Sequence, residues 1–187
     1  VSFSARAEEV VRGRNSKVQS WFMDLNLVMA YWDSADGAPR AYHHTAPINA
    51  LYGLHESLVM LDEEGIEAAW ARHAKNHQAL RAGLEAMGLS LLVDEADRLP
   101  QLNAVVIPDG VDEALVRKTL LANYGLEIGA GLGALAGKVW RIGLMGTSSS
   151  ANHVTLCLAA LETTLVGMGA AITAGASAEA ARGVLFT

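Results

Sequence analysis

The chain has 187 residues, of which 51% are hydrophobic and 18% are charged, so it can bury the core of one ordinary domain or two small ones and is not disordered. Its 14 Lys and Arg against 20 Asp and Glu leave a net charge of -6 with no basic run, which excludes nucleic acid as an expected partner. The single cysteine, Cys157, and the lack of a leader pattern at the start of the chain predict a reducing, cytoplasmic location.

The first third of the chain reads as the end of a strand followed by helices. Residues 1–4 are expected to end a strand, and Ser4 is placed to cap a short helix. Apolar spacing predicts a helix over residues 21–31, which residues 33–39 break, and Pro47 suits the first position of the next helix. We expect four apolar residues to form the buried stripe of that helix: Ile48, Leu51, Leu54 and Leu58.

The most regular helical pattern begins after Gly65 and ends at Gly88. Its repeat is too short for a favoured coiled coil, so we expect one face to pack on a sheet. This face consists of Ile66, Trp70, His73, His77, Leu80, Leu84 and Met87. We place a domain boundary here, with residues 1–64 in one domain and residues 65–187 in a second, smaller one.

The second domain is expected to be a compact α+β unit. Strands are predicted at 89–93, 101–107, 126–128 and 139–144, and helices near 112–124 and 151–168. From about residue 169 the chain is rich in Ala and Gly, which predicts a frayed or loosely docked tail. Residues 142–161 are uncharged and long enough to cross a bilayer, but the polar run at 147–153 predicts a turn and a helix cap, so no membrane is expected.

Several patterns that suggest chemistry have a simpler structural interpretation. The glycines of residues 129–138 match neither a P-loop nor a dinucleotide fingerprint, which favours a flexible connection between strands. His73 and His77 lack a third metal ligand, and the neighbours His43 and His44 should point in different directions, so no metal site is expected. Cys157 lies between two leucines and is expected in the core.

Arg141 is the strongest single candidate for a binding residue. It lies in the apolar segment 139–144, where a guanidinium group is costly unless an anion or another polar group meets it. Its planar fork suits a carboxylate. Spacing alone leaves a structural ion pair and a substrate clamp open.

Two motifs together resemble a known family. Arg40-Ala41-Tyr42-His43-His44-Thr45 and, about a hundred residues later, Gly137-Lys138-Val139-Trp140-Arg141-Ile142-Gly143 are similar to the carboxy-terminal part of class V pyridoxal-phosphate (PLP) aminotransferases, in particular the alanine:glyoxylate and serine:pyruvate enzymes. The resemblance runs from residue 1 to about residue 168.

The resemblance implies the α/β fold type I of PLP-dependent transferases, with residues 1–64 completing the large PLP domain and residues 65–187 forming the small α+β domain. It implies that Arg141 binds the substrate carboxylate, and that Tyr42 and Thr45 bind the PLP phosphate of the neighbouring subunit in a homodimer. The implied reaction transfers an amino group between a small amino acid, alanine or serine, and a small 2-oxo acid, glyoxylate or pyruvate.

The Schiff-base lysine of that family has no counterpart among the four lysines of this chain. We therefore expect a segment of a longer enzyme that contains no catalytic residue of its own. Two alternatives stay open at this point. One is a non-catalytic α+β interaction module without PLP, and the other is a class V desulfurase, which would need a reactive cysteine on a mobile loop.

Overall fold

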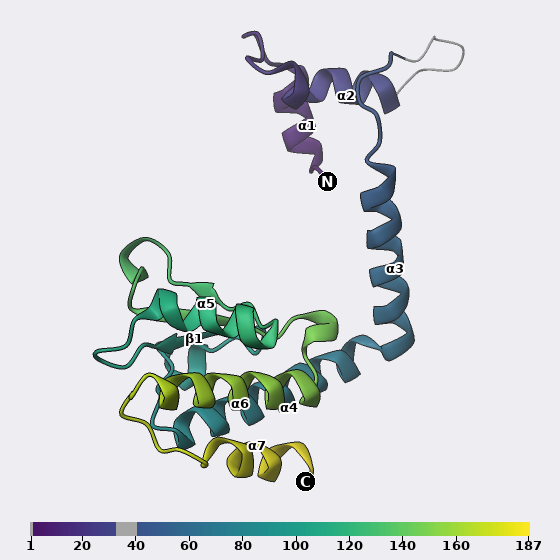
Figure 1. Ribbon diagram of the computed structural model, residues 1–187. Coiled ribbons are helices and arrows are strands. Elements are labelled where there is room, and N and C mark those ends of the chain that lie inside the picture. The colour runs from purple at the N-terminus through teal and green to yellow at the C-terminus, as the bar shows by residue number, and fades with distance from the viewer. Residues whose placement is uncertain (1, 33–40) are drawn as a thin grey trace. The chain divides into compact units, whose positions relative to one another are not determined.

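The computed structural model describes residues 2–32 and 41–187. The chain divides into two compact units, Val1–Leu58 and Val59–Thr187, and each unit is described by itself (Figure 1). The predicted domain boundary between Glu64 and Gly65 falls six residues after this division and stays a prediction. The predicted break at 33–39 and Arg40 of the first motif lie outside the described residues.

The first unit is built from short helices. They are α1 (Ala5–Arg12), the 3-10 turn η1 (Trp21–Met23), α2 (Leu25–Trp32) and the first part of α3 (Ile48–Glu64). Ser4 caps α1 as predicted, because its hydroxyl accepts a hydrogen bond from the backbone N–H of Ala7 at 3.3 Å. Residues 2–4 form no strand, contrary to the prediction, since no described segment pairs with them to supply ladder hydrogen bonds.

Helix α3 begins beside Pro47, as predicted, but its burial was predicted wrongly. The expected buried stripe is open to solvent, with Ile48 51% and Leu58 56% exposed, and no residue of α3 is buried. Periodicity shows that a helix has an apolar face, but it does not show what covers that face. Within the described residues of the first unit nothing covers it.

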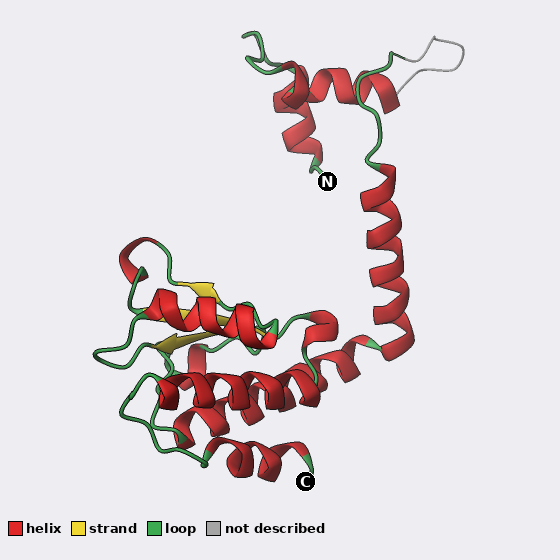
Figure 2. Ribbon diagram, viewed as in Figure 1, coloured by secondary structure: helices red, strands yellow, loops and turns green. Residues whose placement is uncertain are grey.

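The second unit contains a three-stranded antiparallel sheet in the order β1-β3-β2 (Figure 2). The strands are β1 (Leu102–Val106), β2 (Gly129–Ala130) and β3 (Val139–Gly143), and Arg141 of β3 pairs with Ala104 on one side and Gly129 on the other. The predicted strand at 89–93 is reduced to a single bridge between Leu91 and Val105, and the strand predicted at 126–128 lies slightly later, as β2.

The two faces of the sheet differ in environment. Trp140 and Ile142 of β3, and Leu144 just after it, project into the core, where their exposed fractions are 0%, 3% and 2%. Arg141 projects from the other face because side chains alternate along a strand. We call this the open face of the sheet, because Leu102 and Gly143 are exposed on it and Ala104, Gly129 and Arg141 are half-buried. Val139, at the other end of β3 on the same face, is 1% exposed.

Four helices enclose the core of this unit: α4 (Ile66–Ala86), α5 (Glu113–Tyr124), α6 (Ala151–Gly167) and α7 (Ser177–Leu185). Asp112 caps α5 and Ser150 caps α6, each through a side-chain oxygen that accepts a backbone N–H. Helices α4 and α6 pack closely at Gly83, where a Cβ atom would lie 2.4 Å from Leu158. This close contact explains why the helical pattern tolerates a glycine there.

The predicted face of α4 is correct only in its second half. Leu80, Leu84 and Met87 are fully buried, whereas Ile66 and Trp70 are 53% and 60% exposed, because the first turns of α4 extend beyond the core.

None of the described helices combines the length and apolar character that a membrane crossing requires.

The tail was predicted wrongly as loosely docked. Residues 177–185 form α7, which lies alongside α4 (Figure 1) and buries Ser177, Ala181 and Leu185. Small side chains allow the two helices to approach closely, so Ala-rich composition here indicates packing rather than fraying. The carboxylate of Glu162 in α6 also accepts hydrogen bonds from the backbone N–H of Gly175 and the hydroxyl of Ser177, which fixes the start of α7.

Candidate functional site: an arginine on the sheet and a pair of hydroxyls

Arg141 lies at the open face of the sheet, where one hydrogen bond to the described part of the chain fixes its guanidinium. Its Nε donates a hydrogen bond to the backbone carbonyl of Ala130 at 2.8 Å, and the side chain is half-buried. No carboxylate of the described residues forms an ion pair with it. Of the two interpretations left open by spacing, the structural ion pair is therefore not found in the described part of the chain.

Gly129 leaves room for this arrangement. A Cβ atom at position 129 would lie 3.3 Å from Nη2 and 3.4 Å from Nε of Arg141, which is tight packing. The glycine therefore lets the guanidinium lie over β2 while both Nη atoms remain available to a ligand. Sequence reasoning missed Gly129 and Ala130, because their proximity to Arg141 depends on strand pairing.

Tyr42 and Thr45 lie together in the first unit, just before α3. Their hydroxyl oxygens form a hydrogen bond with each other. Tyr42 is 68% exposed, Thr45 is also exposed, and the Tyr42 ring meets the edge of Tyr31 with 6.3 Å between ring centroids. The structure thus places two hydroxyl groups side by side, each able to donate one hydrogen bond.

An aromatic cluster anchors the segment between these hydroxyls. The ring centroids of His43 and His44 lie 4.2 and 5.4 Å from that of Trp21, and Nε2 of His43 lies 2.9 Å from the Trp21 carbonyl oxygen. The two histidine rings are 4.1 Å apart, so the prediction that they point in different directions is wrong. The segment is not a regular strand, and the alternation of side chains therefore does not apply to it.

Among residues 2–32 and 41–187, no three His, Cys, Asp or Glu side chains lie close enough together to bind a metal ion. His73 and His77 instead have structural partners, since their Nδ1 atoms lie 2.6 Å from the Ala69 carbonyl oxygen and 2.7 Å from Oδ1 of Asn103.

Cys157 is a core residue, as predicted. It is 4% exposed, and burial raises the pKa of its thiol to about 12. A thiol of this kind is protonated and inaccessible, so it does not fit the reactive cysteine that a desulfurase needs. The glycine-rich segment connects β2 to β3, as predicted, through a closely packed turn, since a Cβ at Gly131 would lie 2.0 Å from the Leu135 carbonyl oxygen. Its expected flexibility stays a prediction.

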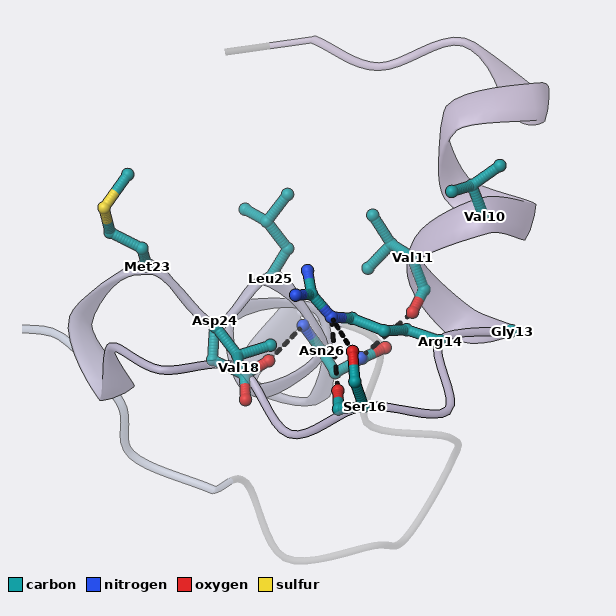
Figure 3. A pocket seen from close by; sticks show the side chains of 10 residues that line it. All are labelled: Val10, Val11, Gly13, Arg14, Ser16, Val18, Met23, Asp24, Leu25 and Asn26. Carbon is teal, nitrogen blue, oxygen red and sulfur yellow. Dashed lines mark hydrogen bonds between the residues drawn. The ribbon is translucent and has the colours of Figure 1, made fainter.

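A separate hollow of about 470 Å³ lies in the first unit (Figure 3). Its polar groups are largely engaged with each other: Nε of Arg14 donates to Ser16, and Asn26 bonds the Val11 carbonyl and the Asp24 carboxylate. None of the three predicted site residues lines it. It therefore carries no part of the predicted chemistry.

Comparison with known proteins decides the family. The model of the family described as aminotransferase class V matches residues 24–154. The chain belongs to the class V aminotransferases.

The chain is similar to several aminotransferases whose names give different substrates. The chain is 40% identical to the alanine–glyoxylate aminotransferase of Callithrix jacchus, covering 88% of this chain and 40% of the relative. The crystal structure of the ureidoglycine–glyoxylate aminotransferase of Bacillus subtilis matches 100% of this chain and 47% of its own, with a TM-score of 0.89 and 39% identity. That of the pyridoxamine–pyruvate aminotransferase of Mesorhizobium loti matches 98% and 46%, with a TM-score of 0.81 and 32% identity. The chain thus spans less than half the length of these relatives.

Membership in the class V aminotransferases confirms the expected fold, the α/β fold type I of PLP-dependent transferases. Pyridoxal 5'-phosphate is the cofactor of this family. Residues of this chain suit the phosphate of the cofactor. The hydroxyls of Tyr42 and Thr45 are exposed, adjacent and able to donate hydrogen bonds to phosphate oxygens. The interaction-module alternative is not favoured.

Proposed function

We propose that the protein to which these residues belong transfers an amino group between a small amino acid and a small 2-oxo acid, with PLP as cofactor. One observation carries the proposal. Arg141 lies at the open face of the sheet without an ion-pair partner among residues 2–32 and 41–187, and the hydrogen bond from its Nε to Ala130 leaves both Nη atoms for a ligand. This arrangement suits bidentate binding of a carboxylate, which amino acids and 2-oxo acids share.

The roles of the chain's residues follow from this proposal. Arg141 binds and orients the substrate carboxylate, and Tyr42 and Thr45 donate their hydroxyl hydrogens to the cofactor phosphate. When bound, PLP would supply an electron sink for the chemistry at the substrate α-carbon. By resemblance, the phosphate belongs to the neighbouring subunit of a homodimer. The homodimer and the cytoplasmic location remain predictions.

The substrate pair is proposed only as a class. Glyoxylate appears in the names of two of the relatives, and pyruvate in the name of the third. Alanine or serine as donor and glyoxylate or pyruvate as acceptor are the specific form of the proposal. All four carry the carboxylate that Arg141 is placed to bind.

Replacing Arg141 in the native protein tests the proposal. Loss of a charge-paired hydrogen bond to a bound carboxylate costs about 2 kcal/mol or more, so Arg141→Ala should lower kcat/KM for both substrates at least about thirtyfold. Steady-state kinetics with alanine and glyoxylate measures this. Arg117→Ala is the control, because Arg117 pairs with Glu113 on α5 and has no proposed contact with substrate. Unchanged kinetics in Arg141→Ala would exclude the assigned role.

A further inference from the structure

Arg72 in α4 joins two parts of the second unit through one guanidinium group. Its Nη1 donates to the carbonyl oxygens of Gly146 and Ser149 at 2.8 and 2.7 Å. Its Nε and Nη2 bind the carboxylate of Glu64 at the end of α3, the latter at 2.7 Å. A lysine could not make these four bonds, because a single ammonium group lacks the planar fork.

Asn76 lies one turn further along α4 and binds the same segment. Its Nδ2 donates to the hydroxyl of Ser149 at 3.1 Å. Asn76 is 5% and Ser149 0% exposed, so a bond lost here would leave a buried polar group unsatisfied. Two side chains of α4 therefore hold residues 145–150, which we call the β3–α6 loop.

The β3–α6 loop carries a side chain that lies beside the strand of Arg141. A Cβ atom at Gly143 would lie 3.6 Å from Cε of Met145, so the Met145 methyl group is next to Gly143. Gly143 and Arg141 are two positions apart on β3 and project from the same face of the sheet. The loop thus places an exposed apolar side chain beside Gly143 on the open face, two positions along the strand from Arg141.

We propose that Arg72 and Asn76 are positioning residues that hold Met145 against the open face, where it contacts the carbon chain of the acid bound by Arg141. This inference rests on the proposed function of Arg141. The contact favours short aliphatic acids, because the methionine occupies space beside the carboxylate that a bulky substituent would need. Arg72 and Asn76 act through the loop and do not touch the substrate.

The test compares Arg72→Lys and Asn76→Ala with Arg81→Lys in the native protein. Arg81 lies on the same helix and pairs with Glu85 and Glu95, away from the loop, which makes it a matched control. Arg72→Lys should raise KM for the amino donor and the 2-oxo acid about three- to tenfold while kcat changes less than about twofold. Asn76→Ala should raise KM by a smaller factor, and Arg81→Lys should leave it unchanged.

A second readout does not depend on turnover. Propionate has a carboxylate but no amino or oxo group, and its dissociation constant, measured by calorimetry, should rise in Arg72→Lys by the same factor as KM. A purely structural role would lower the melting temperature and leave KM and propionate binding unchanged, which would overturn the inference. If Arg72→Lys does not fold, Asn76→Ala decides on the same criteria. If Arg141→Ala leaves KM unchanged, the proposed function fails. If Arg141→Ala raises KM but Arg72→Lys and Asn76→Ala do not, only this inference fails.

Discussion

Arg141 shows how the local environment decides what a charged residue does. Its neighbours Trp140 and Ile142 are buried in the core, yet strand alternation directs its own side chain to the open face. One hydrogen bond, from Nε to the Ala130 carbonyl, sets the direction of the guanidinium. The remaining donors are therefore oriented before any ligand arrives, which reduces the ordering cost of binding.

Gly129 should control this orientation. A side chain at position 129 would crowd the guanidinium, since even a Cβ would lie 3.3 Å from Nη2. We expect Gly129→Val to displace the Arg141 side chain and to raise KM for carboxylic-acid substrates about five- to tenfold, with a small effect on the melting temperature. Steady-state kinetics and thermal unfolding measure the two effects.

The control for Gly129→Val is Gly183→Ala in α7, where an added Cβ meets no atom within 4 Å. It should leave KM unchanged. A Gly129→Val protein with normal KM would show that the guanidinium does not depend on the space that Gly129 leaves.

At the scale of elements, α7 depends on one carboxylate. Burial would raise the pKa of Glu162, but hydrogen bonds from the hydroxyl and N–H of Ser177 and from the N–H of Gly175 outweigh it and lower the pKa below its ordinary value of 4.5. Because the folded pKa is lowered, the stabilisation is fully present above the unfolded pKa. It is lost as the pH falls through the folded pKa.

Glu162→Gln should therefore destabilise the protein at pH 7 by about 1 kcal/mol, because the amide accepts these bonds less strongly than the carboxylate. The difference from the wild type should shrink as the pH falls below 4.5, where the wild-type carboxylate becomes protonated. Urea unfolding at several pH values measures this.

Glu179→Gln is the matched control for the α7 experiment. Glu179 also has a lowered pKa, through its hydrogen bond from Arg182, but the pair is exposed at the surface and contributes little. If Glu162→Gln had the same unfolding midpoint as Glu179→Gln at pH 7, Glu162 would not be the group that docks α7.

At the scale of the whole molecule, the apolar face of α3 is left open by the described residues. Leu51 is 48%, Leu54 55% and Tyr52 72% exposed, and such a row along a helix is typical of an interface. The Tyr42–Thr45 segment directly precedes this helix. The proposed sharing of the phosphate site between subunits is consistent with this position.

Dimers of two differently substituted subunits test whether the phosphate site is shared between subunits. One subunit would carry Arg141→Ala and the other Tyr42→Phe with Thr45→Val. If Tyr42 and Thr45 serve the neighbouring subunit's cofactor, one of the two sites in such a dimer collects all the substitutions and the other is intact. The mixed dimer should then keep about half of the wild-type activity, although each parent homodimer is impaired.

If each subunit used its own Tyr42 and Thr45, both sites of the mixed dimer would be damaged. The activity of separately purified mixed dimers, each subunit carrying a different affinity tag, distinguishes these outcomes. An activity no higher than the average of the two parents would contradict the shared site.

Local sequence patterns predicted those helices and strands that have regularly spaced apolar residues and whose ends are marked by turn residues such as Pro or Gly. The start of α3 beside Pro47, the end of α4 before Gly88 and the strand around Arg141 were predicted correctly, because turn residues and apolar periodicity are properties of short segments. Burial was predicted less well. The exposed face of α3 and the docked α7 depend on which distant surface is available.

The sequence by itself determined the family, through the motifs around Tyr42 and Arg141, and it named the three residues proposed to bind cofactor and substrate. Only the tertiary structure decided their surroundings. It brought Ala130 and Gly129 beside Arg141 through strand pairing, and it brought Arg72 to carbonyl groups 74 and 77 positions away. The reason is physical: hydrogen bonds between segments that are distant along the chain depend on how helices and strands pack, and no local pattern records that packing.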